Sequence, residues 1–323
     1  MARTIVLLCL CLLFAVPAAA ERGAWLTYWD VDGAIDEALS YPGKWDELIC
    51  FEAFFDENGG LIVPEEDFEI LDALADSGAE VYLSLVNDVQ KQDGSIEQKS
   101  RKFLTDNLST EEAQSRHVDK VLELVDSYNL SGIEIDYENM KKDKELWSYF
   151  ASFITRLSDI LTRDGVKLRV VMECGAPLYA EFPEGPEYIC MCYNLYGYHS
   201  GPGPKADRSF LEEVGTNWKS IPGDPRMAFA TGGFLWNNGS VREALRESDA
   251  VNLLETAGIK PERDDESRAL TAAIPGDNGG TLWYADGKTL VYWRDILSEM
   301  GYHRFDLFRL AGNEPDSLEL FLN

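Results

Sequence analysis

Residues 130–140 of the chain read Leu130-Ser131-Gly132-Ile133-Glu134-Ile135-Asp136-Tyr137-Glu138-Asn139-Met140. Apolar and acidic residues alternate here with a period of two, which is the pattern of a β-strand. In a strand, Glu134, Asp136 and Glu138 share one face, and neighbouring members of that face lie roughly 7 Å apart. The segment therefore predicts a strand with three carboxylates on one side and apolar side chains on the other.

Amphipathic helices are predicted on both sides of this strand, over residues 111–128 and 143–161. A strand between two such helices is typical of a central strand in a parallel sheet whose outer face is covered by helices. The three carboxylates then face an enclosed space, which is unfavourable unless they are paired, protonated or wetted by a pocket. We interpret them as a candidate functional site rather than as charges on a solvated antiparallel strand.

The rest of the chain also alternates between strands and helices. Further strands are predicted at residues 23–29, 47–55, 80–86, 166–172, 188–195, 226–234 and 306–310. With the acidic strand they make eight, and a chain of 323 residues accommodates a (β/α)8 TIM barrel of the α/β class. Residues 237–280 are rich in Gly, Asp and Glu and predict a small insertion between strands seven and eight. We expect one domain over residues 21–323.

Composition restricts the class of partner. Hydrophobic residues make up 45% of the chain, enough for a large core, and the formal net charge is −28. Such a negative charge repels nucleic acid and anionic membrane surfaces, whereas neutral glycans carry no such penalty. After residue 20, no apolar stretch reaches the ~18 residues of a membrane span. We therefore expect no nucleic-acid partner, no membrane partner and a monomer.

The first twenty residues have the pattern of a secretory leader. Arg3 precedes an apolar run over residues 5–16, and Ala18-Ala19-Ala20 forms a small-residue cleavage site. This pattern predicts a secreted or periplasmic protein. Four cysteines follow the leader: Cys50, Cys174, Cys190 and Cys192. Their spacing matches no zinc motif, so we expect free buried thiols and no metal site.

The acidic strand resembles the signature strand of the chitinase-like glycoside hydrolases of family 18, in which an Asp-Gly pair leads to Asp-x-Asp-x-Glu. Later segments resemble the sixth-strand motif of that family and three motifs of its bacterial branch, which includes spore-cortex hydrolases. These segments are Met191-Cys192-Tyr193-Asn194, Gly233-Phe234-Leu235-Trp236, Trp283-Tyr284-Ala285-Asp286 and Phe308-Arg309-Leu310-Ala311-Gly312. The resemblance covers residues 23–321, and the motifs come in the order of the family.

The resemblance implies a glycosidase that acts with retention on β-linked glycans containing N-acetylglucosamine, such as chitin oligomers, peptidoglycan or an N-glycan, without a cofactor. Glu138 would be the general acid/base, and the 2-acetamido carbonyl of the substrate would attack in place of a protein nucleophile. Asp136 would orient the acetamido N–H and share a proton with Glu134. Tyr193 would donate its hydroxyl to the acetamido oxygen. Further residues are expected to bind the substrate: Glu134, Met191, Asn194, Trp25, Trp236, Trp283 and Phe308.

Three positions depart from the family pattern and leave alternatives open. Glu134 stands where an aspartate is usual, Ser131 replaces the leading aspartate, and Phe308 replaces a tryptophan. These changes favour a specialised or weak glycosidase over a robust chitinase. One alternative is a catalytically inactive, lectin-like barrel that binds glycans. Another is a divalent-metal site formed by the three carboxylates.

Overall fold

The computed structural model describes residues 21–128, 130, 132–276 and 279–323. The leader predicted at residues 1–20, and Ser131 of the signature strand, lie outside these ranges. In the described part of the chain, no helix combines the length and the apolar composition that a bilayer span requires.

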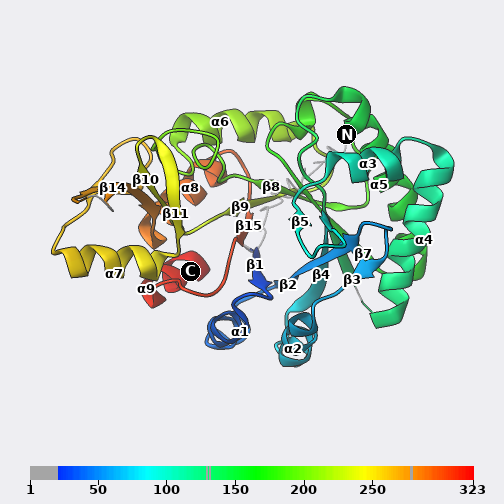
Figure 1. Cartoon of the computed structure of the whole chain (residues 1–323), viewed down its shortest axis with the longest axis horizontal. Coiled ribbons are helices and arrows are strands. Elements are labelled where there is room, and N and C mark those ends of the chain that lie inside the picture. Colours follow the sequence, from blue (N-terminus) through cyan, green and yellow to red (C-terminus); the bar gives the residue numbers. More distant parts are fainter. Residues whose placement is uncertain (1–20, 129, 131, 277–278) are drawn as a thin grey trace, which may run out of the picture.

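Eight parallel strands form a closed barrel at the centre of the molecule (Figure 1). Around the barrel their order is β1 (Glu21–Thr27), β2 (Glu47–Asp56), β4 (Glu80–Gln90), β6 (Gly132–Asp136), β7 (Lys167–Met172), β8 (Glu187–Met191), β9 (Arg226–Phe229) and β15 (Arg304–Leu307). The barrel closes because β1 pairs with both β2 and β15, so that Gly23 lies beside Glu47 on one side and Asp306 on the other. The predicted (β/α)8 TIM barrel is therefore confirmed.

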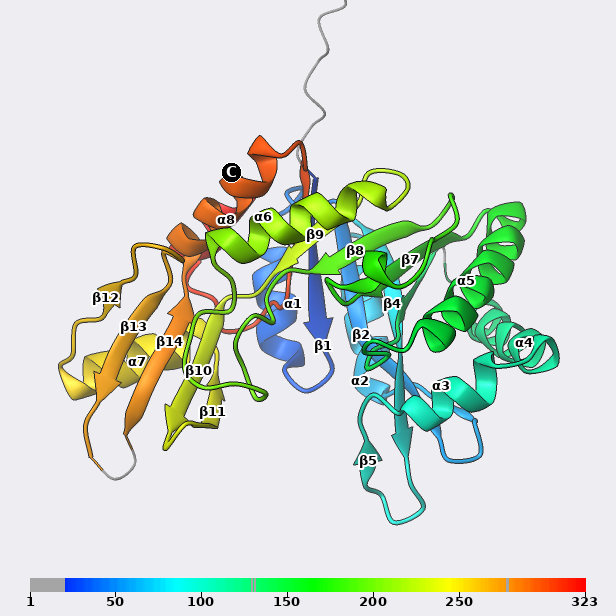
Figure 2. The ribbon, with the colours of Figure 1, turned by 90° about the horizontal axis from the view of Figure 1, so that it is seen from above.

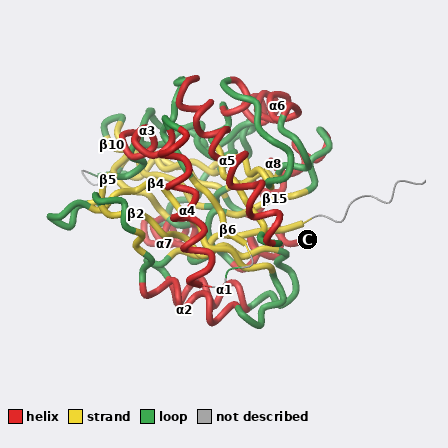
Figure 3. Tube along the Cα trace, turned by 90° about the vertical axis from the view of Figure 1, so that its right-hand side faces the viewer, coloured by secondary structure: helices red, strands yellow, loops and turns green. Residues whose placement is uncertain are grey.

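Helices cover the outside of the barrel (Figures 2 and 3). They are α1 (Val31–Leu39), α2 (Glu65–Leu74), α3 (Arg101–Leu108), α4 (Glu111–Tyr128), α5 (Lys144–Asp164), α6 (Arg208–Asn217), α8 (Gly287–Glu299) and α9 (Pro315–Leu322). Local sequence fixes the ends of α5: the side chain of Asp143 accepts hydrogen bonds from the first turn, and Gly165 ends the helix with a φ of 75°. Short 3-10 turns occur at Ala176–Leu178 and Trp218–Ser220.

Two short strands extend the barrel beyond its carboxyl rim. β3 (Leu61–Ile62) pairs with the end of β2, and β5 (Ile96–Glu97) pairs with the end of β4. Both pairings are antiparallel, so each is a hairpin that continues a barrel strand outward. The hairpin of β4 and β5 carries the segment that leads to Lys99.

The insertion before the last barrel strand forms an antiparallel sheet with its own helix, α7 (Glu247–Ala257). The strand order is β11 (Ser240–Leu245), β10 (Gly232–Asn237), β14 (Gly280–Ala285), β13 (Leu270–Ile274) and β12 (Glu262–Arg263). It lies at the opposite end of the molecule from α4 and α5 (Figure 2). The insertion extends beyond the expected 237–280, because the strand predicted at 226–234 is in fact two strands, β9 and β10.

The apolar side chains pack in layers. The interior of the barrel is filled by Trp25, Ile49, Phe51, Phe54, Tyr82, Val86, Val171, Ile189, Met191 and Ala228. A larger core lies between the strands and the helices, and Ile133 and Ile135 of β6 belong to it. The alternation along β6 therefore directs its isoleucines outward and its carboxylates inward, as the sequence predicts.

Candidate active site

A cavity of about 490 Å³ opens at the carboxyl rim of the barrel. This is within the usual range for small-molecule sites, and it lies on the face where TIM barrels carry their functional residues. Seven side chains discussed below line it: Asn87, Asp88, Lys99, Asp136, Glu138, Tyr193 and Phe308. Met191 and Asn194 line it as well. The cavity therefore brings together the three predicted catalytic residues and three of the predicted binding residues.

Asp136 is the last residue of β6, and its carboxyl group lies on the inner side of the barrel. The residue is 7% exposed, and within the described part of the chain its Oδ1 atom has no hydrogen-bond partner. Burial raises the pKa of Asp136 well above its ordinary value, and the nearby carboxylates of Glu138 and Glu134 raise it further. Asp136 therefore presents a buried carboxyl oxygen that is available to a ligand.

Glu138 is held at the rim by the side chain of Asn87. The backbone N–H of Glu138 donates to Asn87 Oδ1 at 2.9 Å, and Asn87 Nδ2 donates to the carbonyl oxygen of Glu138 at 3.2 Å. These two bonds fix the chain directly after the end of β6. The carboxylate of Glu138 faces the cavity, where its Oε1 atom lies 2.5 Å from the Nζ atom of Lys99.

Lys99 reaches Glu138 from the segment after β5. Its backbone has a φ of 52°, and its N–H donates to Asp88 Oδ1 at 2.7 Å. Burial acts to lower the pKa of Lys99, but the charges of Glu138, Asp136 and Asp88 outweigh it and the pKa is raised. Neither Lys99 nor its contact was predicted from the sequence, because a lone lysine before a helix carries no local signal.

Glu134 lies below the cavity, where both of its oxygens are occupied. Trp25 Nε1 donates to Oε1 at 2.7 Å, and Arg169 Nε donates to Oε2 at 2.9 Å. Full burial raises the pKa of Glu134 to about 8, whereas the indole hydrogen bond lowers it, and the guanidinium favours the ionised form. Glu134 does not line the cavity, and its oxygens are engaged by Trp25 and Arg169 rather than by Asp136. The expected sharing of a proton with Asp136 therefore stays a prediction without a hydrogen bond to support it.

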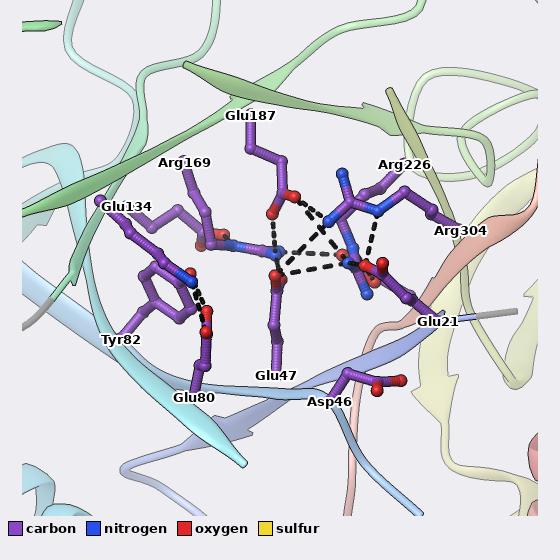
Figure 4. Close-up of polar contacts among 12 residues, drawn as sticks. Glu21, Asp46, Glu47, Glu80, Tyr82, Glu134, Arg169, Glu187, Arg226 and Arg304 are labelled. Atoms are coloured by element: carbon purple, nitrogen blue, oxygen red, sulfur yellow. Dashed lines mark hydrogen bonds and ion pairs between the residues drawn. The ribbon is translucent and has the colours of Figure 1, made fainter. Parts of the chain in front are cut away.

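Arg169 connects Glu134 to a network of charges that closes the lower end of the barrel (Figure 4). Besides Glu134 it pairs with Asp306 at 2.8 Å, with Glu187 at 3.0 Å, and with Glu47. Arg226 pairs with the other oxygen of Asp306 at 2.7 Å. We call these residues the barrel floor: Glu47, Glu134, Arg169, Glu187, Arg226 and Asp306.

The aromatic residues predicted to bind substrate divide into two groups. Phe308 lines the cavity and stacks on Tyr193, with ring centroids 5.8 Å apart and an interplanar angle of 13°. Trp25 and Trp236 are 2% and 1% exposed and do not line the cavity, so they are not placed to contact a ligand in it as predicted. Trp283 also does not line the cavity, but on the insertion sheet it pairs with Phe234, which does.

Trp29, an aromatic residue that the sequence offers as a possible glycan contact, stands at the opening of the cavity and is 50% exposed. Other cavity residues were not predicted from the sequence. Tyr198 is 75% exposed and packs edge-on against Phe234 at 5.4 Å. Lys205 donates to the carbonyl oxygen of Thr231 at 2.6 Å. Burial, and then the charge of Arg309, lower the pKa of Lys205 to about 7. Burial and the acids around it raise the pKa of Glu52, another lining residue, to about 8.

Groups of acidic and thiol side chains that could hold a metal ion lie elsewhere in the described part of the chain. Within the described ranges, two groups of side chains lie close enough to share a metal ion: Glu21, Glu47 and Glu187, and Cys174, Cys190 and Cys192. Neither group contains a residue of the acidic strand. The expected free thiols are observed at all four described cysteines.

No family model matches the chain, and no curated protein sequence does. Solved structures do match. A chitinase from Chromobacterium violaceum is 18% identical with a TM-score of 0.78, and the alignment covers 94% of this chain and 98% of the chitinase. The Bacillus cereus spore cortex-lytic enzyme SleL is 15% identical with a TM-score of 0.77, covering 94% and 74%. A mutant class V chitinase from Nicotiana tobaccum in complex with NAG4 is 9% identical with a TM-score of 0.71, covering 94% and 98%.

At these identities the similarity establishes the fold. The neighbours include chitinases and a spore cortex-lytic enzyme, the two groups that the sequence motifs resemble.

Proposed function

We propose that the protein is an exported glycosidase that hydrolyses β-linked glycans containing N-acetylglucosamine and retains the configuration at the cleaved carbon. The observation that carries the proposal is the unpartnered oxygen of Asp136, buried beside Glu138 and Tyr193 in one cavity. The chitinase and cortex-lytic structures that share the fold, one of them in complex with NAG4, support the same class of reaction and ligand. Export rests on the leader pattern of residues 1–20.

In this proposal Glu138 protonates the leaving oxygen, because it lies nearest the opening of the cavity. The acetamido carbonyl of the substrate attacks the anomeric carbon, and an oxazolinium ion forms while the glycosidic bond breaks. Glu138, now a carboxylate, then takes a proton from water, which attacks the anomeric carbon and restores the acetamido group. Two displacements at the same carbon give net retention.

Asp136 would receive the N–H of the acetamido group on its unpartnered oxygen. As positive charge develops on that group, the ionised form of Asp136 becomes favourable. The proton that reaches the leaving oxygen would then come from Glu138, and Asp136 would offset the positive charge of the acetamido group. Tyr193 would direct its hydroxyl to the acetamido oxygen, and the stacked ring of Phe308 would support the sugar from below.

A second candidate function is glycan binding without cleavage. The contact between Lys99 and Glu138 favours it, because the ammonium group at 2.5 Å already engages the oxygen that would have to donate the proton. The two candidates therefore differ in whether this contact is broken when the glycan binds.

The test is a screen of the protein on chitin oligomers, peptidoglycan fragments and an N-glycan. Products are identified by mass spectrometry, and the anomer formed first is identified by NMR. We expect cleavage of at least one glycan, with the β-anomer appearing first. In Asp136→Asn we expect most activity to be lost and the unfolding temperature to be kept. Binding of a glycan without cleavage would support the second candidate, and an Asp136→Asn variant with native turnover would exclude assistance by the acetamido group.

A further inference from the structure

Three cysteines gather behind β8, the strand that leads to Tyr193. Cys190 lies on β8, Cys192 follows it, and Cys174 follows β7, the neighbouring strand. Their Sγ atoms all lie within 4.8 Å of one another, and those of Cys174 and Cys190 are 3.6 Å apart. A fourth sulfur is close, because the Sδ atom of Met227 on β9 lies 3.7 Å from the Sγ atom of Cys192.

This sulfur cluster, Cys174, Cys190, Cys192 and Met227, lies in the core between the strands and the helices rather than in the cavity. Cys190, Cys192 and Met227 are fully buried, and Cys174 is half-buried and packs against the same core. On the other side of β8, Met191 and Tyr193 face the cavity. The cluster and the candidate active site are therefore back to back, and the glycosidase chemistry uses none of these sulfurs.

We propose that the sulfur cluster is a binding site for Cu(I). Three thiols and a thioether are soft ligands, which monovalent copper prefers. Zinc in structural sites almost always takes four ligands from thiolate, imidazole and carboxylate groups. Among the described residues no imidazole or carboxylate joins the three thiols, and the thioether of Met227 lies 3.7 Å from one of them. The set therefore fits a low-coordinate soft ion better than tetrahedral Zn²⁺.

The thiol of Cys174 donates to the carbonyl oxygen of Met191 at 2.9 Å, which holds its sulfur beside the other two. Thiols bind a metal as thiolates, so Cu⁺ would replace thiol protons of the cluster and release them.

The test is an anaerobic titration of the full chain, fully reduced, with Cu(I) in competition with the chromophoric chelator bathocuproine disulfonate. Cys9 and Cys11 are first replaced by serine so that they do not contribute. We expect one Cu(I) to be withdrawn from the chelator per chain. Cys174→Ser, Cys190→Ser and Cys192→Ser should each weaken binding by more than the roughly 10–100-fold that loss of an outer-shell partner costs.

Cys50→Ser is the matched control, because Cys50 is also buried but contacts Asp67 at a different position on the barrel. It should leave the affinity unchanged. Met227→Leu keeps the volume of the side chain, and it should weaken binding without changing the thiol count. Circular dichroism of each variant establishes that it is folded.

Three results would overturn the proposal. One is that the folded protein withdraws no Cu(I) from the chelator. Another is that a folded serine variant at one of the three cysteines binds Cu(I) as tightly as the parent. The third is that Zn²⁺, titrated in the same way with a zinc indicator, binds more tightly than Cu(I). None of these results depends on glycan cleavage, so the copper site and the proposed function fail separately.

Discussion

The ammonium nitrogen of Lys99 lies 2.5 Å from Glu138 Oε1, so the candidate acid already meets a positive charge in the free protein. The negative charge of Glu138 raises the pKa of Lys99. In the free protein Lys99 is therefore held as the charged ammonium, directed at the oxygen that a glycan would have to reach.

Replacing Glu138 by glutamine should lower turnover of a natural glycoside by ~10²–10⁴-fold, the usual contribution of general acid catalysis. The loss should be smaller on a nitrophenyl glycoside, because that leaving group departs with little protonation. Glutamine keeps the shape, so glycan binding measured by calorimetry should survive. Glu145→Gln, on the exposed side of α5, is the control. Equal hydrolysis of the natural glycan by wild type and Glu138→Gln would show that another group is the acid.

At the scale of secondary structure, the sequence predicts those elements whose pattern is local. The acidic strand was predictable because isoleucines and carboxylates alternate along it. The isoleucines face the core between the strands and the helices, and the carboxylates face the barrel interior. The break of residues 226–234 into the two strands β9 and β10 was not predictable, because it depends on Gly232. That residue has a φ of 60°, and a Cβ atom on it would lie 2.3 Å from the carbonyl oxygen of Leu245, a residue of a partner strand.

The residues of the candidate site likewise include some that a local pattern predicts and some that it does not. Asp136, Glu138 and Tyr193 stand at strand ends that a motif can identify. Lys99 reaches the site only because the hairpin of β4 and β5 turns back over the rim, and that return is set by tertiary structure. Trp25 was predicted to bind substrate, but it is buried beneath the cavity, where its indole N–H donates to Glu134.

The contact between α4 and β6 contains a buried histidine that makes stability depend on pH. His117 Nε2 lies 2.7 Å from the hydroxyl of Tyr137, and burial lowers the pKa of His117 to about 3. In the unfolded chain the ordinary pKa is ~6.5. Between these values the unfolded chain binds the extra proton, so this group makes the free energy of unfolding fall as the pH falls from 6.5 towards 3.

His117→Gln should therefore lower the stability at neutral pH but flatten its dependence on pH. Between pH 7 and pH 4 we expect the variant to lose up to roughly 3 kcal/mol less than the wild type. The measurement is urea unfolding at several pH values in that range. His303→Gln, at a half-buried histidine just before β15, should keep the wild-type slope. An unchanged slope in His117→Gln would mean that other groups account for the acid sensitivity.

At the scale of the whole molecule, the barrel floor joins strands that are distant in the sequence. Arg169 on β7 contacts Glu134 of β6, Glu47 of β2 and Asp306 of β15. Both Arg169 and Glu134 are 0% exposed. Buried ion pairs add little net stability when they form, but removing one partner leaves an uncompensated charge in a medium of low dielectric constant.

Arg169→Met should consequently destabilise the fold by about 3–5 kcal/mol, measured by denaturant unfolding. Adding Glu134→Gln to this variant should recover part of the loss, because it removes one of the carboxylates left without a cation. Arg208→Met is the control, since its pair with Glu212 is exposed and contributes at most about 1 kcal/mol. If Arg169→Met lowered the free energy of unfolding by only about 1 kcal/mol, the barrel floor would not hold the strands together.

The two hydrogen bonds of Glu134 have an evolutionary consequence. Its carboxylate reaches Trp25 and Arg169 at the same time, at 2.7 and 2.9 Å, and aspartate is one methylene shorter. Aspartate at position 134 would not reach both partners in the same way, and Arg169 would then keep only its pairs with Glu47, Glu187 and Asp306. We expect the two positions to covary among close relatives, with glutamate at 134 inherited together with arginine at 169.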